Sequence, residues 1–172
     1  MLFWWRTMMN RFYGSGGDLS TQLSPWQARA QGFDPAISIF RLERDLRFRS
    51  DIAGGDIVVP VGFLSDLASI PRIAWSLGYD PDCNEMELAA WTHDYNYSHV
   101  GNVPVVIHSV DARPRTVMVA LTRKQCDKIL CDEGMAELGA KRWQRNVVYI
   151  MLRLFGRGSF NTAAPSARWG PK

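Results

Sequence analysis

The chain has 172 residues, of which 47% are hydrophobic and 22% are charged, and this composition suits one globular domain with a buried core. Its net charge is +3, from 20 basic and 17 acidic residues, which is too small to indicate a nucleic-acid-binding protein. The three cysteines, Cys83, Cys126 and Cys131, form no C-x-x-C pair, so the sequence does not indicate a disulfide framework.

The N-terminal segment is strongly apolar. Residues 2–13 are mostly aromatic residues, Leu and Met, interrupted by Arg6 and Arg11. The apolar run before Arg6 is too short for a signal peptide, and no run in the chain reaches the ~18 residues that a transmembrane helix needs. Two interpretations stay open: a helix docked on its own domain, or one that binds a partner chain or a membrane surface. Residues 14–34, with many Gly, Ser and Pro, predict a loop, so residues 1–34 form an N-terminal segment and linker.

The next part of the chain predicts strands. Apolar and polar residues alternate over 36–42 and 46–49, which is typical of half-buried strands. Residues 57–63 predict another strand, and Pro60 within it indicates an edge. Residues 103–121 predict a β-hairpin with its turn near Asp111.

Three helices are expected around this hairpin. The first begins near Asn84 and ends near Ser98, and the second begins at Thr122, whose spacing to Gln125 predicts a capping box, and ends near residue 139. The third covers 141–155, and residues 157–172 predict an irregular tail. The order predicts one α+β domain over 35–156, with a small antiparallel sheet followed by a core of about three helices that contains the inserted hairpin.

A His-Asp pair interrupts the apolar pattern of the first helix. Buried His and Asp side chains need a partner, water or a metal. His93 and Tyr97 share a face, whereas Asp94 lies about 100° around the helix. We therefore expect two linked tasks: His93 acts as a base on water, and Asp94 binds a metal or orients the site.

Asp127 of the second helix falls close to its apolar face, between Cys126 and Ile129. If the two helices are antiparallel neighbours, Asp127 would fix the tautomer of His93. A polar core pair without a catalytic role is the other interpretation of these residues.

Residues 65–72 form a second unusual motif, in which Asp66 follows a strand. Its Asp and Ser side chains can simply close a turn. The functional interpretation places Asp66 beside Asp94 as a metal ligand, with Ser69 lining the cleft and Arg72 holding Asp66 or an anionic substrate. No H-E-x-x-H or similar spacing supports zinc at the histidines.

The third helix is basic and amphipathic, since its Lys and Arg residues alternate with Trp, Val, Ile and Leu. Such a helix commonly lies on the surface with its apolar face in the core. Contact with a membrane surface or an acidic partner is the alternative.

These motifs resemble those of a family of tailed-phage and prophage proteins of unknown function. The resemblance covers roughly 35–156, and the motifs that carry it are F-x-S-D-L-A-S-I-P-R at 63–72, H-D-Y-x-Y at 93–97, Asp127, and R-L-F-G at 153–156. Ser65 stands where Thr is more usual in that family. The resemblance implies a phage origin, with the virion or the host cytoplasm as location.

A helix with His-Asp-x-x-Tyr, a hairpin and a second helix with Asp is also similar to the secretory sn-2 phospholipases. This similarity implies His93 as general base, Asp94 as a ligand of calcium and Asp127 as the orienting acid. The chain has neither the disulfides nor the glycine-rich calcium loop of those enzymes. Asp66 is the candidate for the missing calcium ligand.

Two functions follow from the sequence. One is a hydrolase that acts on lipid or peptidoglycan of the host envelope, with His93 assisting the attack of water. The other is a non-catalytic virion component, such as a tail or connector protein, in which the His-Asp network is structural. Its partners would be other virion proteins, and the excess of Trp and the apolar N-terminus motivate it.

Overall fold

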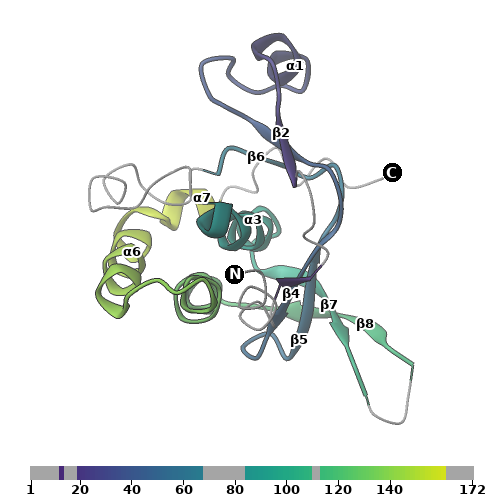
Figure 1. Ribbon diagram of the computed structural model, residues 1–172, viewed down its shortest axis with the longest axis vertical. Coiled ribbons are helices and arrows are strands. Elements are labelled where there is room, and N and C mark those ends of the chain that lie inside the picture. Colours follow the sequence, from purple (N-terminus) through teal and green to yellow (C-terminus); the bar gives the residue numbers. More distant parts are fainter. Residues whose placement is uncertain (1–11, 14–18, 68–83, 110–112, 162–172) are drawn as a thin grey trace, which may run out of the picture.

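The computed structural model of the chain describes residues 12–13, 19–67, 84–109 and 113–161 (Figure 1). The predicted site residues Ser69 and Arg72, and most of the apolar segment 2–13, lie outside these residues. The helices and strands are, in chain order, β1 (Phe12–Tyr13), β2 (Ser20–Gln22), α1 (Pro25–Ala30), β3 (Phe40–Leu42), β4 (Leu46–Ser50), β5 (Gly55–Val59), β6 (Leu64–Ser65), α3 (Asn84–Ser98), β7 (Asn102–Ile107), β8 (Arg115–Ala120), α4 (Arg123–Lys128), the π-helix η1 (Ile129–Gly134), α5 (Met135–Glu137), α6 (Arg142–Phe155) and α7 (Arg157–Asn161).

Two antiparallel sheets organise the strands. The larger has the order β1-β4-β5-β7-β8, and the smaller has the order β2-β3-β6. The hairpin of β7 and β8 extends away from the body of the molecule (Figure 1). The fold is therefore mixed α+β, as the order of predicted elements indicates.

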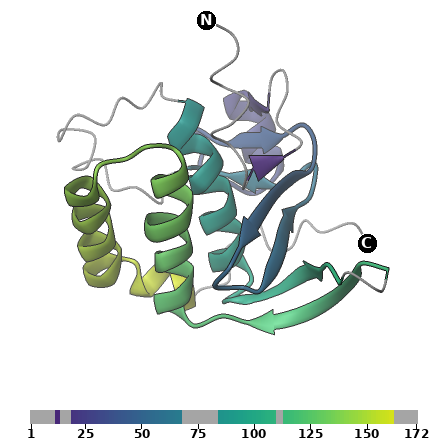
Figure 2. The same cartoon turned by 60° about the horizontal axis from the view of Figure 1, so that its bottom comes forward.

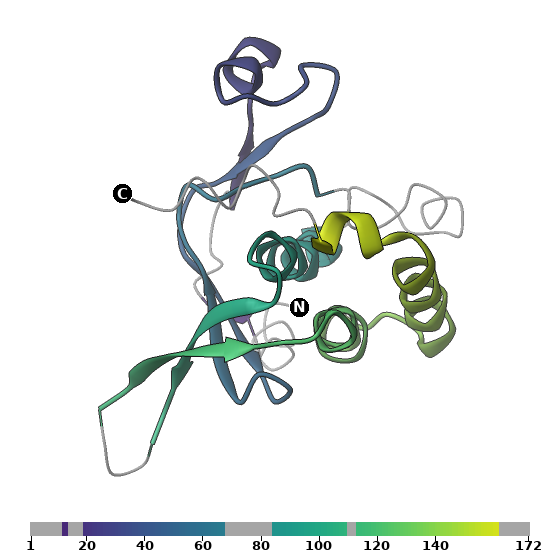
Figure 3. The ribbon, with the colours of Figure 1, turned by 180° about the vertical axis from the view of Figure 1, so that it is seen from behind.

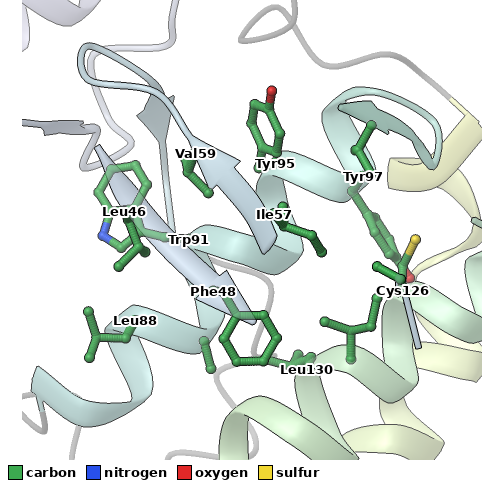
Figure 4. Packing of buried hydrophobic residues seen from close by; sticks show 14 of the residues in the cluster. Leu46, Phe48, Ile57, Val59, Leu88, Trp91, Tyr95, Tyr97, Cys126 and Leu130 are labelled. Carbon is green, nitrogen blue, oxygen red and sulfur yellow. The ribbon is translucent and has the colours of Figure 1, made fainter. Parts of the chain in front are cut away.

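Alternation along β4 shows how the sheet forms the core. Leu46 and Phe48 are buried while Arg47 and Arg49 between them are exposed, because successive side chains of a strand point to opposite faces. Figure 4 shows the inward residues of β4 and β5 facing Trp91 and Leu88 of α3. The sheet thus covers one side of α3.

The helices lie side by side on the other side of α3. In Figure 2 the segment from α4 to α5 stands between α3 and α6, and α6 is the outermost helix. Almost every side of α3 is consequently enclosed, which places its polar residues among core side chains. Among the described residues, no helix has the length and apolar character needed to span a membrane.

Several predicted elements match closely. Helix α3 has the predicted bounds, α6 starts one residue later than expected, and β7 and β8 form the predicted hairpin. The capping box is also present: the Thr122 hydroxyl accepts the Gln125 N–H, and the Gln125 side chain accepts the Thr122 N–H. These features depend on local sequence rules, which explains the agreement.

The strand prediction over 57–63 is wrong in its end and in its position. Strand β5 ends at Val59 and is central, between β4 and β7, so Pro60 does not mark an edge. Pro60 instead begins a turn, in which its carbonyl accepts the Phe63 N–H and Gly62 has a φ of +82°. The strand predicted over 36–42 is likewise shorter, since β3 covers only 40–42.

Three further predictions need correction. The segment 14–34 is not only a loop, because β2 and α1 form there, and its Leu23 and Ala28 pack with Ile39 and Leu64 in a second small core. The second helix has about the predicted bounds, but its middle part, η1, is a π-helix. The start of the predicted irregular tail is the helix α7.

Candidate active site

Helix α3 places the rings of His93 and Tyr97 in contact with each other. The two residues are four positions apart, and their ring centroids lie 4.0 Å from each other. Only 1% of His93 is exposed, so every group that faces its two ring nitrogens influences its charge.

Helix α4 brings Asp127 to the Nε2 atom of His93. The carboxylate is fully buried, and Oδ1 lies 3.5 Å from Nε2. The structure therefore brings the predicted pair together. Because an ionised carboxylate can only accept hydrogen bonds, Asp127 favours the tautomer of His93 with a hydrogen on Nε2, and Nδ1 is the nitrogen that faces the other way.

Two more side chains hold Asp127. The Tyr97 hydroxyl donates to Oδ1, and Arg153 Nη1 of α6 lies 2.9 Å from Oδ2. Arg153 was missed as a site residue from the sequence, although the R-L-F-G motif contains it. The signal that could have found it is the requirement of a buried carboxylate for a positive partner.

Asp94 approaches the opposite side of the imidazole. Its Oδ1 lies 3.7 Å from His93 Nδ1, and 14% of its side chain is exposed. Although Asp94 is about 100° around the helix from His93, its side chain extends back toward the ring. His93 stands between two carboxylates, one fully buried and one that reaches solvent.

Ser65 takes the place that the sequence predicted for Asp66. The Ser65 hydroxyl donates to Asp94 Oδ2 and accepts the N–H of Leu67. Asp66 itself is exposed. The described residues contain no group of three or more His, Cys, Asp or Glu side chains able to hold a metal ion, and the calcium site of Asp94 and Asp66 stays a prediction.

The charges of this cluster support one another. Burial opposes protonation of His93, but Asp127 and Asp94 outweigh it and hold the pKa of His93 above its ordinary value. Burial also opposes ionisation of Asp127, yet hydrogen bonds from His93, Tyr97 and Arg153 keep the pKa of that carboxyl below its ordinary value. Burial and Asp127 together raise the pKa of Tyr97, which therefore remains a hydrogen-bond donor.

Three buried polar atoms on α3 have no hydrogen-bond partner in the part of the chain that the structure describes. They are Nδ1 of His93 and both amide atoms of Asn96, one turn later. An unpaired buried polar atom costs about 1–3 kcal/mol, so these atoms are suited to pair with a bound polar group. Asn96 was also missed from the sequence, where an amide inside an apolar helix pattern is the available signal.

Two other buried carboxylates belong to separate places. Glu133 of η1 binds the β4–β5 turn, since it accepts from the Ser50 hydroxyl at 2.6 Å and from the Asp51 N–H at 2.9 Å. Asp56 of β5 lies 3.0 Å from Arg49 and 2.7 Å from His108. His108 thus contacts the Asp56 carboxylate, whereas His93 contacts Asp94 and Asp127.

Comparison with protein families identifies the family of this chain. The family described as "Protein of unknown function (DUF1353)" matches residues 40–152, about two thirds of the chain. The chain belongs to this family. The DUF1353 match includes Ser65, His93, Asp94 and Asp127, and it ends one residue before Arg153. No curated protein matches the chain, and no solved structure does.

Proposed function

We propose that this DUF1353 chain is a phage-encoded hydrolase that acts on lipid or peptidoglycan of the host envelope. The observation that supports it is His93, buried between the fully buried Asp127 and the partly exposed Asp94. The phage origin rests on the motif resemblance, and the hydrolase on the similarity of the His-Asp helix to the sn-2 phospholipases. The virion and the host cytoplasm are the expected locations.

In the proposed mechanism Asp127 accepts the Nε2 hydrogen of His93 and thereby leaves a lone pair on Nδ1. Nδ1 takes a proton from water on the side of Asp94, as the water oxygen forms a bond to the acyl carbon of the substrate. The leaving group then receives that proton when its bond to carbon breaks. Asp94, oriented by Ser65, would hold the water or a polar group of the substrate.

The raised pKa of His93 predicts the pH dependence of this reaction. A base must be neutral to accept a proton, so kcat/KM should rise with pH and level off above the folded pKa of His93. The profile should therefore lie to the alkaline side of an ordinary histidine, whose pKa is about 6.5.

The test is hydrolysis of bacterial lipid vesicles and of purified peptidoglycan by the full chain, with added calcium and with a chelator. His93→Gln should lose activity by about 10²–10⁴-fold. His108→Gln, at the Asp56 cluster, is the matched control and should retain activity. The proposal would be overturned if the folded wild type hydrolysed neither substrate, or if His93→Gln were as active as the wild type.

The second candidate is a non-catalytic virion component such as a tail or connector protein. The 1% exposure of His93 favours it, because a buried network of charged side chains can serve stability alone. Ultracentrifugation of the full chain and of a chain without residues 1–11 tests it. Assembly that depends on these residues supports a structural role, whereas two identical monomers contradict it.

A further inference from the structure

Helix α6 has apolar residues on two opposite faces. Val148 and Leu152 are buried against the rest of the molecule. Trp143, Ile150 and Leu154 are each half exposed or more, and their positions fall within about 40° on the opposite side of the helix. Isolated exposed apolar residues are ordinary, but a stripe along three turns of one helix is typical of a contact surface.

The position of α6 leaves this stripe uncovered by the described elements. The helix is the outermost element of the helical side, as Figures 2 and 3 both show. Its inner side faces α4 and α5, and Arg153 extends inward to Asp127. The outer stripe therefore faces away from the described elements.

The charges around the stripe have one sign. Residues 141–157 contain five basic residues and no acidic residue. Three of the basic side chains are exposed at the two ends of the helix, namely Lys141, Arg142 and Arg157. The surface thus combines an exposed apolar stripe with basic ends, and its complement is apolar and anionic.

A second copy of the chain is a poor complement. In a two-fold symmetric dimer the same patch packs against itself, so the basic ends of one α6 would oppose basic residues of its partner. The apolar segment 2–13 is no better, because its charged residues are Arg6 and Arg11.

We propose that α6 docks this chain on an anionic lipid bilayer. An interfacial helix has Trp and Leu on the face that enters the lipid and Lys or Arg toward the headgroups, and this is the arrangement of the stripe and its ends. Docking depends on neither His93 nor hydrolysis, so its test stands apart from that of the proposed function.

The experiment is co-sedimentation of the full chain with vesicles of phosphatidylglycerol and phosphatidylcholine, and with vesicles of phosphatidylcholine alone. The wild type should bind the anionic vesicles at least tenfold more tightly, and added salt should weaken that binding. Leu154→Glu should reduce binding at least tenfold. Met118→Glu changes an exposed apolar residue of β8 and is the matched control, which should bind like the wild type.

The basic ends have their own pair of variants. Arg142→Gln should weaken binding, whereas Arg115→Gln, an exposed arginine of the hairpin, should not. Thermal unfolding of each variant establishes that it folds. Unchanged binding by Leu154→Glu, or equal binding to both kinds of vesicle, would overturn the proposal. Self-association of the free chain that Leu154→Glu abolishes would assign the stripe to a second copy instead.

Discussion

Arg153 of α6 lies 2.9 Å from the buried carboxylate of Asp127, although 34% of the arginine side chain is exposed. It is the cation that joins the outer helix to the centre of the helical core. Burial opposes the ionisation of Asp127, and the arginine offsets it: Arg153 supports the ionised carboxylate, which in turn accepts from His93 and Tyr97.

Removing this cation should destabilise the fold. Arg153→Gln leaves Asp127 without its charged partner, and we expect the free energy of unfolding to fall by about 2 kcal/mol, less than for a fully buried pair because Arg153 reaches solvent. Arg157→Gln, four positions later and exposed, should change it by less than about 0.5 kcal/mol. Chemical denaturation measures both, and equal effects would contradict a special role for Arg153.

The charge of His93 should stabilise the fold at low pH. Because its folded pKa is raised, its contribution is complete below the ordinary pKa of about 6.5 and is lost as pH rises through the folded value. The stability difference between the wild type and His93→Gln should therefore be larger at pH 5.5 than at pH 9, as chemical denaturation at about these two values would show. A difference that does not depend on pH would mean that the two carboxylates leave the pKa of His93 unchanged.

Sequence rules predicted the parts of the site that depend on helix geometry. His93 and Tyr97 share a face because they are four residues apart, and the capping box at Thr122 fixed the start of the helix that carries Asp127. The α+β class followed from the order of strands and helices for the same reason, since local patterns decide it.

The remaining parts depend on choices that local patterns do not contain. Strand β6 ends at Ser65, which is buried, and the next residue, Asp66, is exposed, so a difference of one position decides which of the two side chains reaches Asp94. The direction of the Asp94 side chain depends on its torsion angles. Arg153 belongs to a helix whose sequence pattern indicates a basic surface, yet its side chain contacts the buried Asp127.

Ser65 provides a test of the contact with Asp94. Ser65→Ala removes the donor to Asp94 and the acceptor of the Leu67 N–H, and we expect it to lower the free energy of unfolding by about 1–2 kcal/mol. Ser65→Thr keeps the hydroxyl and suits a strand, so it is the matched control and should differ little from the wild type. If Thr destabilises as much as Ala, the effect comes from packing and not from the hydroxyl.

Glu133 should hold the turn between β4 and β5 through its charge. Glu133→Gln weakens the acceptor for Ser50, Asp51 and Ile52, with an expected loss of about 1–2 kcal/mol in the free energy of unfolding. Asp132→Asn removes an exposed carboxylate from the same π-helix and should have a much smaller effect. Hydrogen exchange of the Asp51 amide gives a second readout, which should accelerate only in the Glu133 variant.

Gly156 is required where the end of α6 meets Tyr97. A Cβ there would lie 2.7 Å from the carbonyl oxygen of Leu152 and 3.0 Å from the Tyr97 hydroxyl, so Gly156→Ala should cost about 1–3 kcal/mol of stability. Gly158→Ala, in the adjoining helix α7, meets nothing within 4 Å and should be neutral or stabilising by up to about 1 kcal/mol.

A double-mutant cycle identifies the source of the Gly156 effect. Tyr97→Phe removes the hydroxyl that the new Cβ would approach, so Gly156→Ala should cost less in that background, and the two changes should not add. Thermal unfolding of the four proteins measures the coupling. Strict additivity would show that the Leu152 carbonyl alone limits residue 156, and that the contact of α6 with the His93 cluster does not depend on the glycine.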